Sequence, residues 1–188
     1  MGKTRKTGGE EMTKKNVTPE EVVKYFKNEF KTKIKGAKIV KRKFGLKKKE
    51  SNYIWMKIDR TAFKDAINHL IKLQFPHLSV ASGNDLGKTI EILYHFTLNY
   101  DQPHEEIILN ISVELPKTDP TIDTISDIIP GALITEREKI EMLGITVKGI
   151  PDDSRVFVPD DFPEGVYPWR RDKTGPEKYY KNLHEVKK

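Results

Sequence analysis

The stretch that looks most like a reactive site is residues 83–89, which read GNDLGKT. These are the residue types of a phosphate-binding loop, in which backbone amides and a lysine hold a nucleotide. That pattern needs four residues between its glycines, and here there are three. It must also lead into a helix, whereas Ile90, Ile92 and Tyr94 alternate as they do in a strand. We therefore interpret residues 83–89 as a hairpin turn and predict no nucleotide site.

Metal ligands and catalytic nucleophiles are the next candidates. The histidines are His69, His77, His95, His104 and His184. No two of them have helical ligand spacing, and the chain has no cysteine, which excludes disulfides and thiolate ligands for zinc or an iron–sulfur cluster. No Ser, Thr or Lys has a recognisable base near it in the sequence. We predict no catalytic, metal-binding or cofactor-binding residue, so redox cofactors would have to lie in other chains.

The spacing of apolar residues predicts two helices, each followed by strands. Thr18 and Glu21 form a capping-box pattern, and the apolar residues after them repeat at helical spacing. A second helix follows the capping residue Asp59. His95 is out of phase with the apolar positions around it and should point away from the core face. The strand-like stretches are residues 37–44, 53–59, 77–82, 89–99 and 105–115.

The order helix, two strands, helix, three strands fits an α+β fold of ferredoxin-like type, with an antiparallel sheet and both helices on one face. Residues 1–16 are polar and are predicted to be a disordered basic arm, and residues 17–115 form the α+β domain. Prolines then punctuate residues 116–188, which carry one helix at about residues 133–143. We predict that this last part is an extended proline-rich strap that docks on another protein.

The chain is basic and rich in charge. Its 34 Lys and Arg outnumber its 28 Asp and Glu, which gives a formal charge of +6. Such a balance is typical of proteins that meet nucleic acid, an anionic membrane or an acidic protein, and also of thermostable surfaces. No apolar run reaches the roughly 18–20 residues of a membrane-spanning helix, and the start lacks the apolar stretch of a signal peptide. We expect a cytosolic chain, or one bound to the cytosolic face of a membrane assembly.

The most specific pattern lies in residues 116–172. An acid–Arg–acid triplet precedes a Gly-Ile turn, and a Gly-x-Pro turn and a Trp-Arg-Arg-Asp run follow. Arg137 and Glu141 are one helical turn apart and can form an ion pair, and Gly144 suits the end of the helix. Trp169 beside two arginines has the composition of an interface hot spot. The predicted partner interface consists of Glu136, Arg137, Glu138, Glu141, Gly144, Gly149, Pro151, Arg155, Trp169, Arg170, Arg171 and Asp172.

In order and spacing, this segment resembles the 30-kDa subunit family of respiratory complex I and of the related membrane-bound hydrogenases. The resemblance implies a non-catalytic structural subunit in the peripheral arm. Such a subunit braces a large catalytic subunit and an iron–sulfur subunit, and it meets the membrane arm only indirectly. Nickel–iron and iron–sulfur clusters are then expected in those partners, and none in this chain.

Two departures from the family pattern favour its archaeal branch. Ile150 stands between Gly149 and Pro151 where the family has His, and Arg155 is single where the family has paired arginines. They favour a ferredoxin-linked, hydrogen-evolving hydrogenase coupled to ion pumping. A sulfur-reducing complex or a quinone-linked complex of the NADH dehydrogenase type is the alternative.

The alternative of another class is an RNA-binding α+β module. Tyr53 and Trp55 alternate on one predicted strand, at positions suited to base stacking. The basic stretch 42–46, however, lacks the second glycine and the following aromatics of that module's signature. We therefore expect no nucleic-acid partner and keep RNA binding as the second hypothesis.

Overall fold

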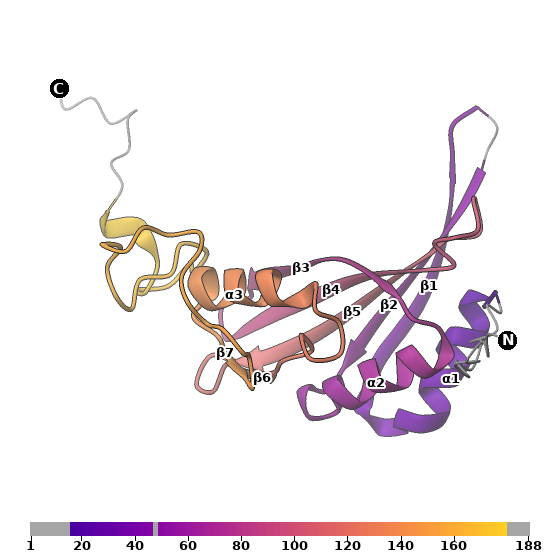
Figure 1. Cartoon of the computed structure of the whole chain (residues 1–188), viewed down its shortest axis with the longest axis horizontal. Coiled ribbons are helices and arrows are strands. Elements are labelled where there is room, and N and C mark those ends of the chain that lie inside the picture. Colours follow the sequence, from indigo (N-terminus) through magenta and orange to yellow (C-terminus); the bar gives the residue numbers. More distant parts are fainter. Residues whose placement is uncertain (1–15, 47–48, 180–188) are drawn as a thin grey trace, which may run out of the picture.

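The structure is a computed structural model that describes residues 16–46 and 49–179 (Figure 1). The predicted basic arm, residues 1–16, lies outside the described residues except for Asn16. Both predicted helices and the five predicted strands are present. The elements are α1 Pro19–Phe30, β1 Ile34–Phe44, β2 Lys49–Ile58, α2 Phe63–Leu73, β3 His77–Asp85, β4 Thr89–Leu98, β5 Ile107–Pro116, β6 Thr121–Asp123, α3 Ala132–Leu143 and β7 Thr146–Lys148, with short 3-10 turns at Lys31–Lys33, Arg60–Ala62 and Pro176–Lys178.

The strands β1 to β5 form one sheet in the order β1-β2-β5-β4-β3. Neighbouring strands run antiparallel except β2 and β5, which are parallel from the pair Asn52 and Ile107 to the pair Ile58 and Val113. The chain leaves β2, crosses through α2 to the far edge at β3, and returns through β4. Because two hairpin reversals follow that crossover, β5 arrives parallel to β2. The α+β class is confirmed, and this central parallel pair is where the sheet differs from the antiparallel arrangement predicted.

The helices α1 and α2 cover one face of this sheet. α1 begins with the predicted capping box, in which Thr18 Oγ1 accepts the Glu21 N–H and the Glu21 carboxylate accepts the Thr18 N–H. Phe63 of α2 packs its ring 4.6 Å from the ring of Tyr94 on β4. Alternate β4 residues, Tyr94 and Phe96 among them, are buried in this layer. Apolar burial worth about 2 kcal/mol per side chain therefore holds the helices to the sheet.

The opposite face of the sheet carries a polar network. His95 lies there, with its Nδ1 2.7 Å from Asn110 Oδ1 and its Nε2 2.9 Å from Ser82 Oγ. These contacts link three neighbouring strands, β3, β4 and β5, through one imidazole. The prediction that His95 points away from the core face is confirmed, and its role in the fold is structural.

The core continues past residue 116 into the segment predicted to dock. α3 packs over β3, where a side chain at Gly83 would collide with Leu143 and crowd Lys139. The short strands β6 and β7 pair in parallel and bring their apolar side chains to the same cluster. The folded unit therefore reaches β7, and the described chain after it has no strand and a single 3-10 turn. The buried apolar residues of this part are Ile122, Ile125, Ile129, Ala132, Leu143, Ile145 and Val147.

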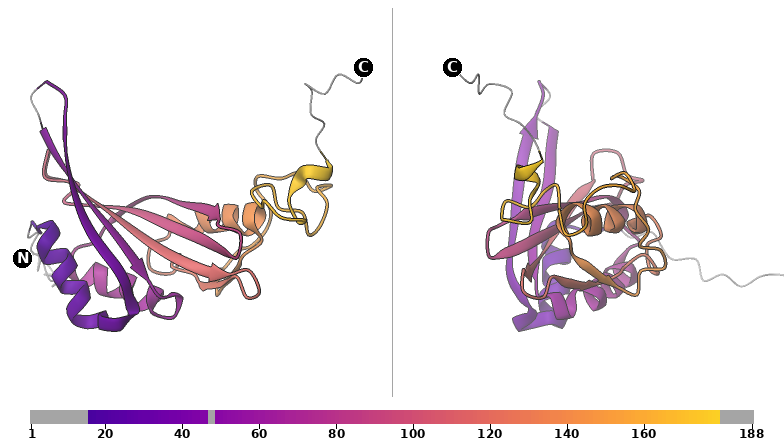
Figure 2. Two further views of the ribbon diagram at one scale, coloured as in Figure 1. Left: turned by 180° about the vertical axis from the view of Figure 1, so that it is seen from behind. Right: turned by 90° about the vertical axis from the view of Figure 1, so that its left-hand side faces the viewer.

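The two ends of the long axis differ in kind. A hairpin formed by β1 and β2 projects from one end, and the irregular chain after β7 lies at the other, beside α3 (Figures 1 and 2). The predicted strap covers residues 116–188. Because the folded unit includes the first part of that segment, we restrict the name strap to residues 149–175. Across the part of the chain that the structure describes, no helix has the length and apolar character needed to cross a membrane.

Candidate functional site

The stretch that resembled a phosphate loop is the β3–β4 hairpin. Gly87 adopts a positive φ of 88°, and its N–H donates to Asp85 Oδ1 at 2.8 Å. The chain then continues as β4, so no helix N-terminus faces the turn. The predicted hairpin is confirmed. Within residues 16–46 and 49–179, no group of three His, Asp or Glu side chains is placed to hold a metal ion.

Glu136, the first acid of the triplet, lies inside the protein. Its side chain accepts the Thr124 hydroxyl at 2.5 Å and the Ile125 N–H at 2.9 Å, and the residue is 1% exposed. Burial raises the pKa of this carboxyl, although both hydrogen bonds oppose the shift. Burial also raises the pKa of the neighbouring Tyr94, and the Glu136 charge adds to that. The prediction that Glu136 faces a partner is therefore corrected, because its carboxylate fixes the loop between β6 and α3.

Arg137 reaches sideways from α3 to the strap. Its guanidinium donates to the Ser154 carbonyl at 2.7 and 2.9 Å and lies 3.0 Å from an Asp152 carboxylate oxygen. The predicted ion pair with Glu141 is wrong. The strap runs beside α3 and gives Arg137 two acceptors, the Ser154 carbonyl and the Asp152 carboxylate. Glu141, one turn along the helix, would provide only a carboxylate.

Glu141 is the second point at which α3 holds the strap. Its carboxylate accepts three consecutive backbone N–H groups, those of Val156 at 2.6 Å and of Phe157 and Val158 at 2.9 Å. The residue is 8% exposed, so these charge-assisted bonds form largely out of water. One carboxylate thereby fixes the path of three residues, and their side chains are left to point elsewhere.

Arg170 returns from the strap to the end of α3. Its Nε donates to the Leu143 carbonyl at 2.5 Å, and its guanidinium lies 5.5 Å from the ring centre of Tyr167. A cation at a helix C-terminus satisfies free carbonyls and complements the helix dipole. The predicted helix end at Gly144 is confirmed by its left-handed conformation, φ 62°. The Tyr167 ring lies directly over Gly144, where any side chain would collide with it.

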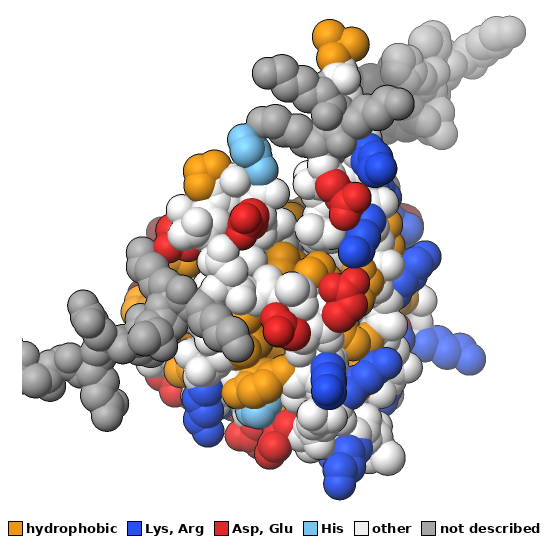
Figure 3. All heavy atoms as spheres, turned by 90° about the vertical axis from the view of Figure 1, so that its right-hand side faces the viewer, with side chains coloured by type: hydrophobic (Ala, Val, Ile, Leu, Met, Phe, Trp, Pro, Cys, Tyr) orange, Lys and Arg blue, Asp and Glu red, His pale blue; other side chains and the backbone are white. Residues whose placement is uncertain are grey.

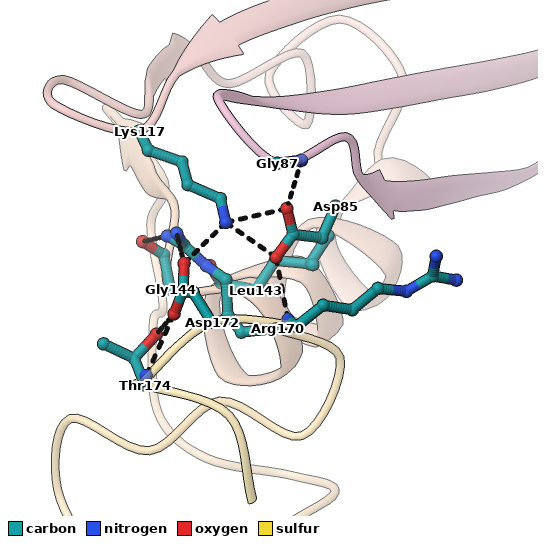
Figure 4. A network of polar contacts seen from close by, with 9 residues as sticks. Asp85, Gly87, Lys117, Leu143, Gly144, Arg170, Asp172 and Thr174 are labelled. Carbon is teal, nitrogen blue, oxygen red and sulfur yellow. Dashed lines mark hydrogen bonds and ion pairs between the residues drawn. The ribbon is translucent and has the colours of Figure 1, made fainter.

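A partly buried ionic cluster joins the strap to the sheet (Figure 4). Lys117 Nζ lies between two carboxylates, 2.7 Å from Asp85 and 2.5 Å from Asp172. Asp85 also accepts the Arg171 N–H at 2.8 Å, and Asp172 accepts the Thr174 N–H at 2.9 Å. The strap thus ends on β3 and on the residue that follows β5.

Each carboxyl of this cluster is held ionised by its neighbours. Burial alone would raise the pKa of Asp85, but hydrogen bonds from Arg171, Lys117 and Gly87 outweigh it and lower that pKa. Lys117, followed by Thr174, lowers the pKa of Asp172 well below the ordinary value. Burial would lower the pKa of Lys117, and the two carboxylates instead raise it. All three groups are therefore charged near neutral pH, and the contact is ionic.

Asp85 and Lys117 are absent from the interface predicted from the sequence. The alternation of side chains along β3 could have identified Asp85. It pairs with Ile90 and so lies on the buried face of the β3–β4 hairpin, where a carboxylate needs a charged or hydrogen-bonding partner. Lys139 was also missed. It is 1% exposed, burial lowers its pKa, and its Nζ lies 5.0 Å from the Trp169 ring centre and in contact with Glu138.

The remaining predicted interface residues lie on the strap and at its start. Gly149 makes a turn with φ 77°, and Pro151 is exposed. Arg155 donates to the Phe162 carbonyl at 3.0 Å and so closes the loop between them. A pocket of about 260 Å³ separates this loop from α3, with Ile140 on its wall. The large apolar side chains that the strap leaves most exposed are Val156, Phe157 and Trp169.

These observations define a class of protein: an α+β sheet domain whose last helix is wrapped by a strap held through buried charges. The chain belongs to the respiratory-chain NADH dehydrogenase 30 Kd subunit family, whose sequence profile matches residues 56–179. The predicted family is confirmed. It rests on the segment 116–172 and also on the second half of the sheet domain.

Curated relatives and a solved structure agree with this assignment. The chain is 40% identical over 131 residues to membrane-bound hydrogenase subunit beta of Pyrococcus furiosus, covering 69% of this chain and 75% of that one. It is 32% identical over 130 residues to one of the subunits of the F(420)H(2) dehydrogenase of Methanosarcina mazei, covering 67% and 79%. The fold matches a chain in the structure of the membrane-bound sulfane sulfur reductase, an archaeal respiratory membrane complex. That match has a TM-score of 0.66 and 19% identity, and it covers 90% of this chain and 95% of the other.

Proposed function

We propose that this chain is a non-catalytic structural subunit of the peripheral arm of a membrane-bound, complex I-related oxidoreductase, on the cytosolic face. It would brace a large catalytic subunit and an iron–sulfur subunit, which hold the nickel–iron and iron–sulfur centres. We further propose that the parent complex is a ferredoxin-linked, hydrogen-evolving hydrogenase coupled to ion pumping. The 40% identity to a membrane-bound hydrogenase subunit beta supports that branch.

The observation that carries the structural role is the way in which the strap is held. Glu141 and Arg170 are used inside the chain to fix backbone atoms of the strap and of α3. Phe157 is left 48% exposed and Trp169 40% exposed. Aromatic side chains on a pre-formed backbone suit an interface hot spot, because binding then costs little ordering of the chain.

The test is purification of the complex through this subunit. We would add an affinity tag to the chain in its native cells, solubilise the membranes and measure metal content and hydrogen evolution with reduced viologen. The proposal predicts recovery of a large subunit and an iron–sulfur subunit together with nickel, iron and hydrogen evolution. If the purified complex contains iron but no nickel, the structural role stands, and the parent complex is a sulfur-reducing or quinone-linked relative rather than a hydrogenase.

A matched pair of variants locates the contact. Phe157→Ser and Phe44→Ser each remove a half-exposed phenylalanine, 48% and 49% exposed, from opposite ends of the molecule. We expect Phe157→Ser to lower the recovery of the partner subunits and Phe44→Ser to leave it unchanged. Recovery of the wild-type chain alone, as a monomer in the membrane-free fraction, would overturn the proposed function.

A further inference from the structure

The β1–β2 hairpin extends beyond the rest of the sheet. β2 pairs with β5 only from Asn52 onward, whereas its pairing with β1 continues to the pair Phe44 and Lys49. The outer part is therefore a two-stranded ribbon with no third strand beside it, and it projects away from the globule (Figure 1). A lone ribbon of this kind has little stability of its own in water, so its projection calls for a role outside the core.

The outer hairpin concentrates positive charge. Residues 41–50 read KRKFGLKKKE, with six cations and one carboxylate, and residues 41–46 are all exposed. Lys41 makes an ion pair with Glu20 of α1 at 3.3 Å, and Arg42 lies 5.6 Å from the Tyr53 ring centre. Figure 3 views this end of the molecule and shows Lys and Arg side chains gathered along one side of it. This charge favours an anionic ligand.

Two apolar side chains follow Lys41, Arg42 and Lys43 toward the outer end of the hairpin. Phe44 is 49% exposed, and Leu46 is fully exposed. The turn between them is made by Gly45 with φ 67°. Apolar side chains at the outer end, with cations behind them on β1, match the layering of an anionic bilayer surface, in which charged headgroups lie outside an apolar interior.

We infer that the outer hairpin, through Arg42, Lys43, Phe44 and Leu46, binds the surface of an anionic phospholipid bilayer. A bilayer needs no cleft shaped to a narrow ribbon, whereas a protein partner would. Of the two aromatics suited to base stacking, Tyr53 lies under Arg42, and Trp55, which is 42% exposed, lies in the part of β2 that pairs with β5, so binding of single-stranded RNA is a separate outcome of the test. The strap is at the opposite end of the molecule, so both contacts can form at once (Figure 2).

The test is co-sedimentation of the full chain with vesicles of 30% phosphatidylglycerol in phosphatidylcholine, compared with pure phosphatidylcholine vesicles. We expect binding to the anionic vesicles only, weakened by salt. Each cation near such a surface contributes roughly fivefold in partition, so Arg42→Ser with Lys43→Ser should weaken binding on the order of 20-fold. Phe44→Ser with Leu46→Ser, which changes no charge, should weaken it as well.

The control removes the same charge from the other end, by Lys173→Ser with Lys178→Ser, both of which are outside the hairpin. It should bind as the wild type does. If the hairpin and control variants lose the same amount of vesicle binding, the binding depends only on the net charge of the chain, and the inference is overturned. Absence of vesicle binding would overturn the inference too. So would a chain that binds single-stranded RNA but not vesicles, if the hairpin variants abolish the RNA binding.

A second readout reports the insertion itself. The chain has no cysteine, so Leu46→Cys creates a unique site for an environment-sensitive fluorophore, and Val156→Cys on the strap is its matched control. Anionic vesicles should shift the emission of the label at position 46 to the blue and leave the label at position 156 unchanged. No shift at position 46 under conditions where the protein co-sediments would overturn the insertion. These experiments need no partner subunit, so their failure would leave the proposed function standing.

Discussion

The sheet domain and the strap are held by different forces. In the sheet domain, whole apolar side chains such as Phe26, Phe63 and Phe96 are fully buried between helices and strands. The strap has no strand of its own, and it is held chiefly by charged side chains that contact backbone atoms or another charge, with the Trp169 N–H bonded to the Met142 carbonyl beside them. Apolar burial is non-directional and accumulates over many contacts, whereas these polar contacts fix a path at a few points.

The difference shows how a small protein can fix the path of an irregular segment and still leave large apolar side chains exposed on it. Because Glu141 and Arg170 hold backbone atoms, the strap keeps its shape although its apolar side chains are exposed or only half-buried, as Tyr167 is over Gly144. Phe157 and Trp169 then stay available for a partner. The comparison predicts that damage to the sheet domain unfolds everything, while damage to the strap stays local.

The largest effect is expected in the sheet domain. Phe63→Ala should lower the free energy of unfolding by about 3–5 kcal/mol, because it removes a fully buried ring packed near Tyr94. Urea denaturation followed by circular dichroism measures this. Phe157→Ala removes the same side chain from a half-exposed site and should cost about 0.5 kcal/mol or less. Equal losses at the two positions would break the comparison.

The cluster that joins the two regions should come next. Asp85→Ala leaves Lys117 with one carboxylate and removes the acceptor of the Gly87 and Arg171 N–H groups. We expect a loss of about 2 kcal/mol in the free energy of unfolding, below the value for a fully buried pair because Asp172 still faces Lys117. Asn84→Ala is the adjacent control and should change little. A neutral Asp85→Ala would mean that the cluster does not hold the strap to the sheet.

A smaller and local effect is expected from the carboxylate that holds the strap. Glu141→Ala removes the acceptor of three consecutive N–H groups, at Val156, Phe157 and Val158. Amide hydrogen exchange there should quicken by roughly 10- to 100-fold, with the exchange of the sheet unchanged. Glu164→Gln on the exposed part of the strap is the control. Faster exchange throughout β4 and β5 would show that the strap is not an independent unit.

The smallest effect concerns pH. The pKa of Asp172 is lower in the folded chain than its ordinary value of 3.8, so its contribution to stability is fully present above that value. The contribution is lost as the pH falls below about 4 and through the lowered pKa. At pH 7, Asp172→Asn should cost about 1 kcal/mol or less, since the side chain is partly exposed. Denaturation at pH 7 and pH 3 should show the gap to wild type closing in acid, and a gap that widens there would contradict the ionic contact.

Glu136 should behave in the opposite sense, because burial raises its pKa above the ordinary 4.5. Its ionisation then costs stability as the pH rises from that value through the raised pKa. Glu136→Gln removes this dependence and keeps a hydrogen-bonding side chain. The stability of the variant relative to wild type should therefore increase from pH 4 to pH 7, and denaturation midpoints at the two pH values test that.

Much of the sheet domain follows from the sequence, because local rules decide it. The capping box at Thr18, the phase of His95 and the hairpin at residues 83–89 depend on neighbours in the chain, and all three are confirmed. The parallel pairing of β2 with β5 does not. It depends on which sheet edge the crossover reaches, and no local pattern encodes that.

The site was less predictable, for a physical reason. The sequence marks which charged residues the 116–172 segment carries, but not which of them are used inside the chain. Glu136, Glu141 and Arg170 find backbone partners 11 to 27 positions away, and Asp85 meets Arg171 at a separation of 86. Such partners are set by the tertiary path of the strap. Glu136, Glu141 and Arg170 are therefore used inside the chain, while Phe157 and Trp169 stay exposed.

The most direct test of the central claim is hydroxyl-radical footprinting of the intact complex against the isolated chain. The account predicts that oxidation of Phe157 and Trp169 falls severalfold in the complex, because the strap presents them to a partner subunit. The buried Phe63 should be unreactive in both samples, as an internal control. Equal oxidation of Phe157 and Trp169 in the complex and in the free chain would contradict the claim that the strap is the docking surface.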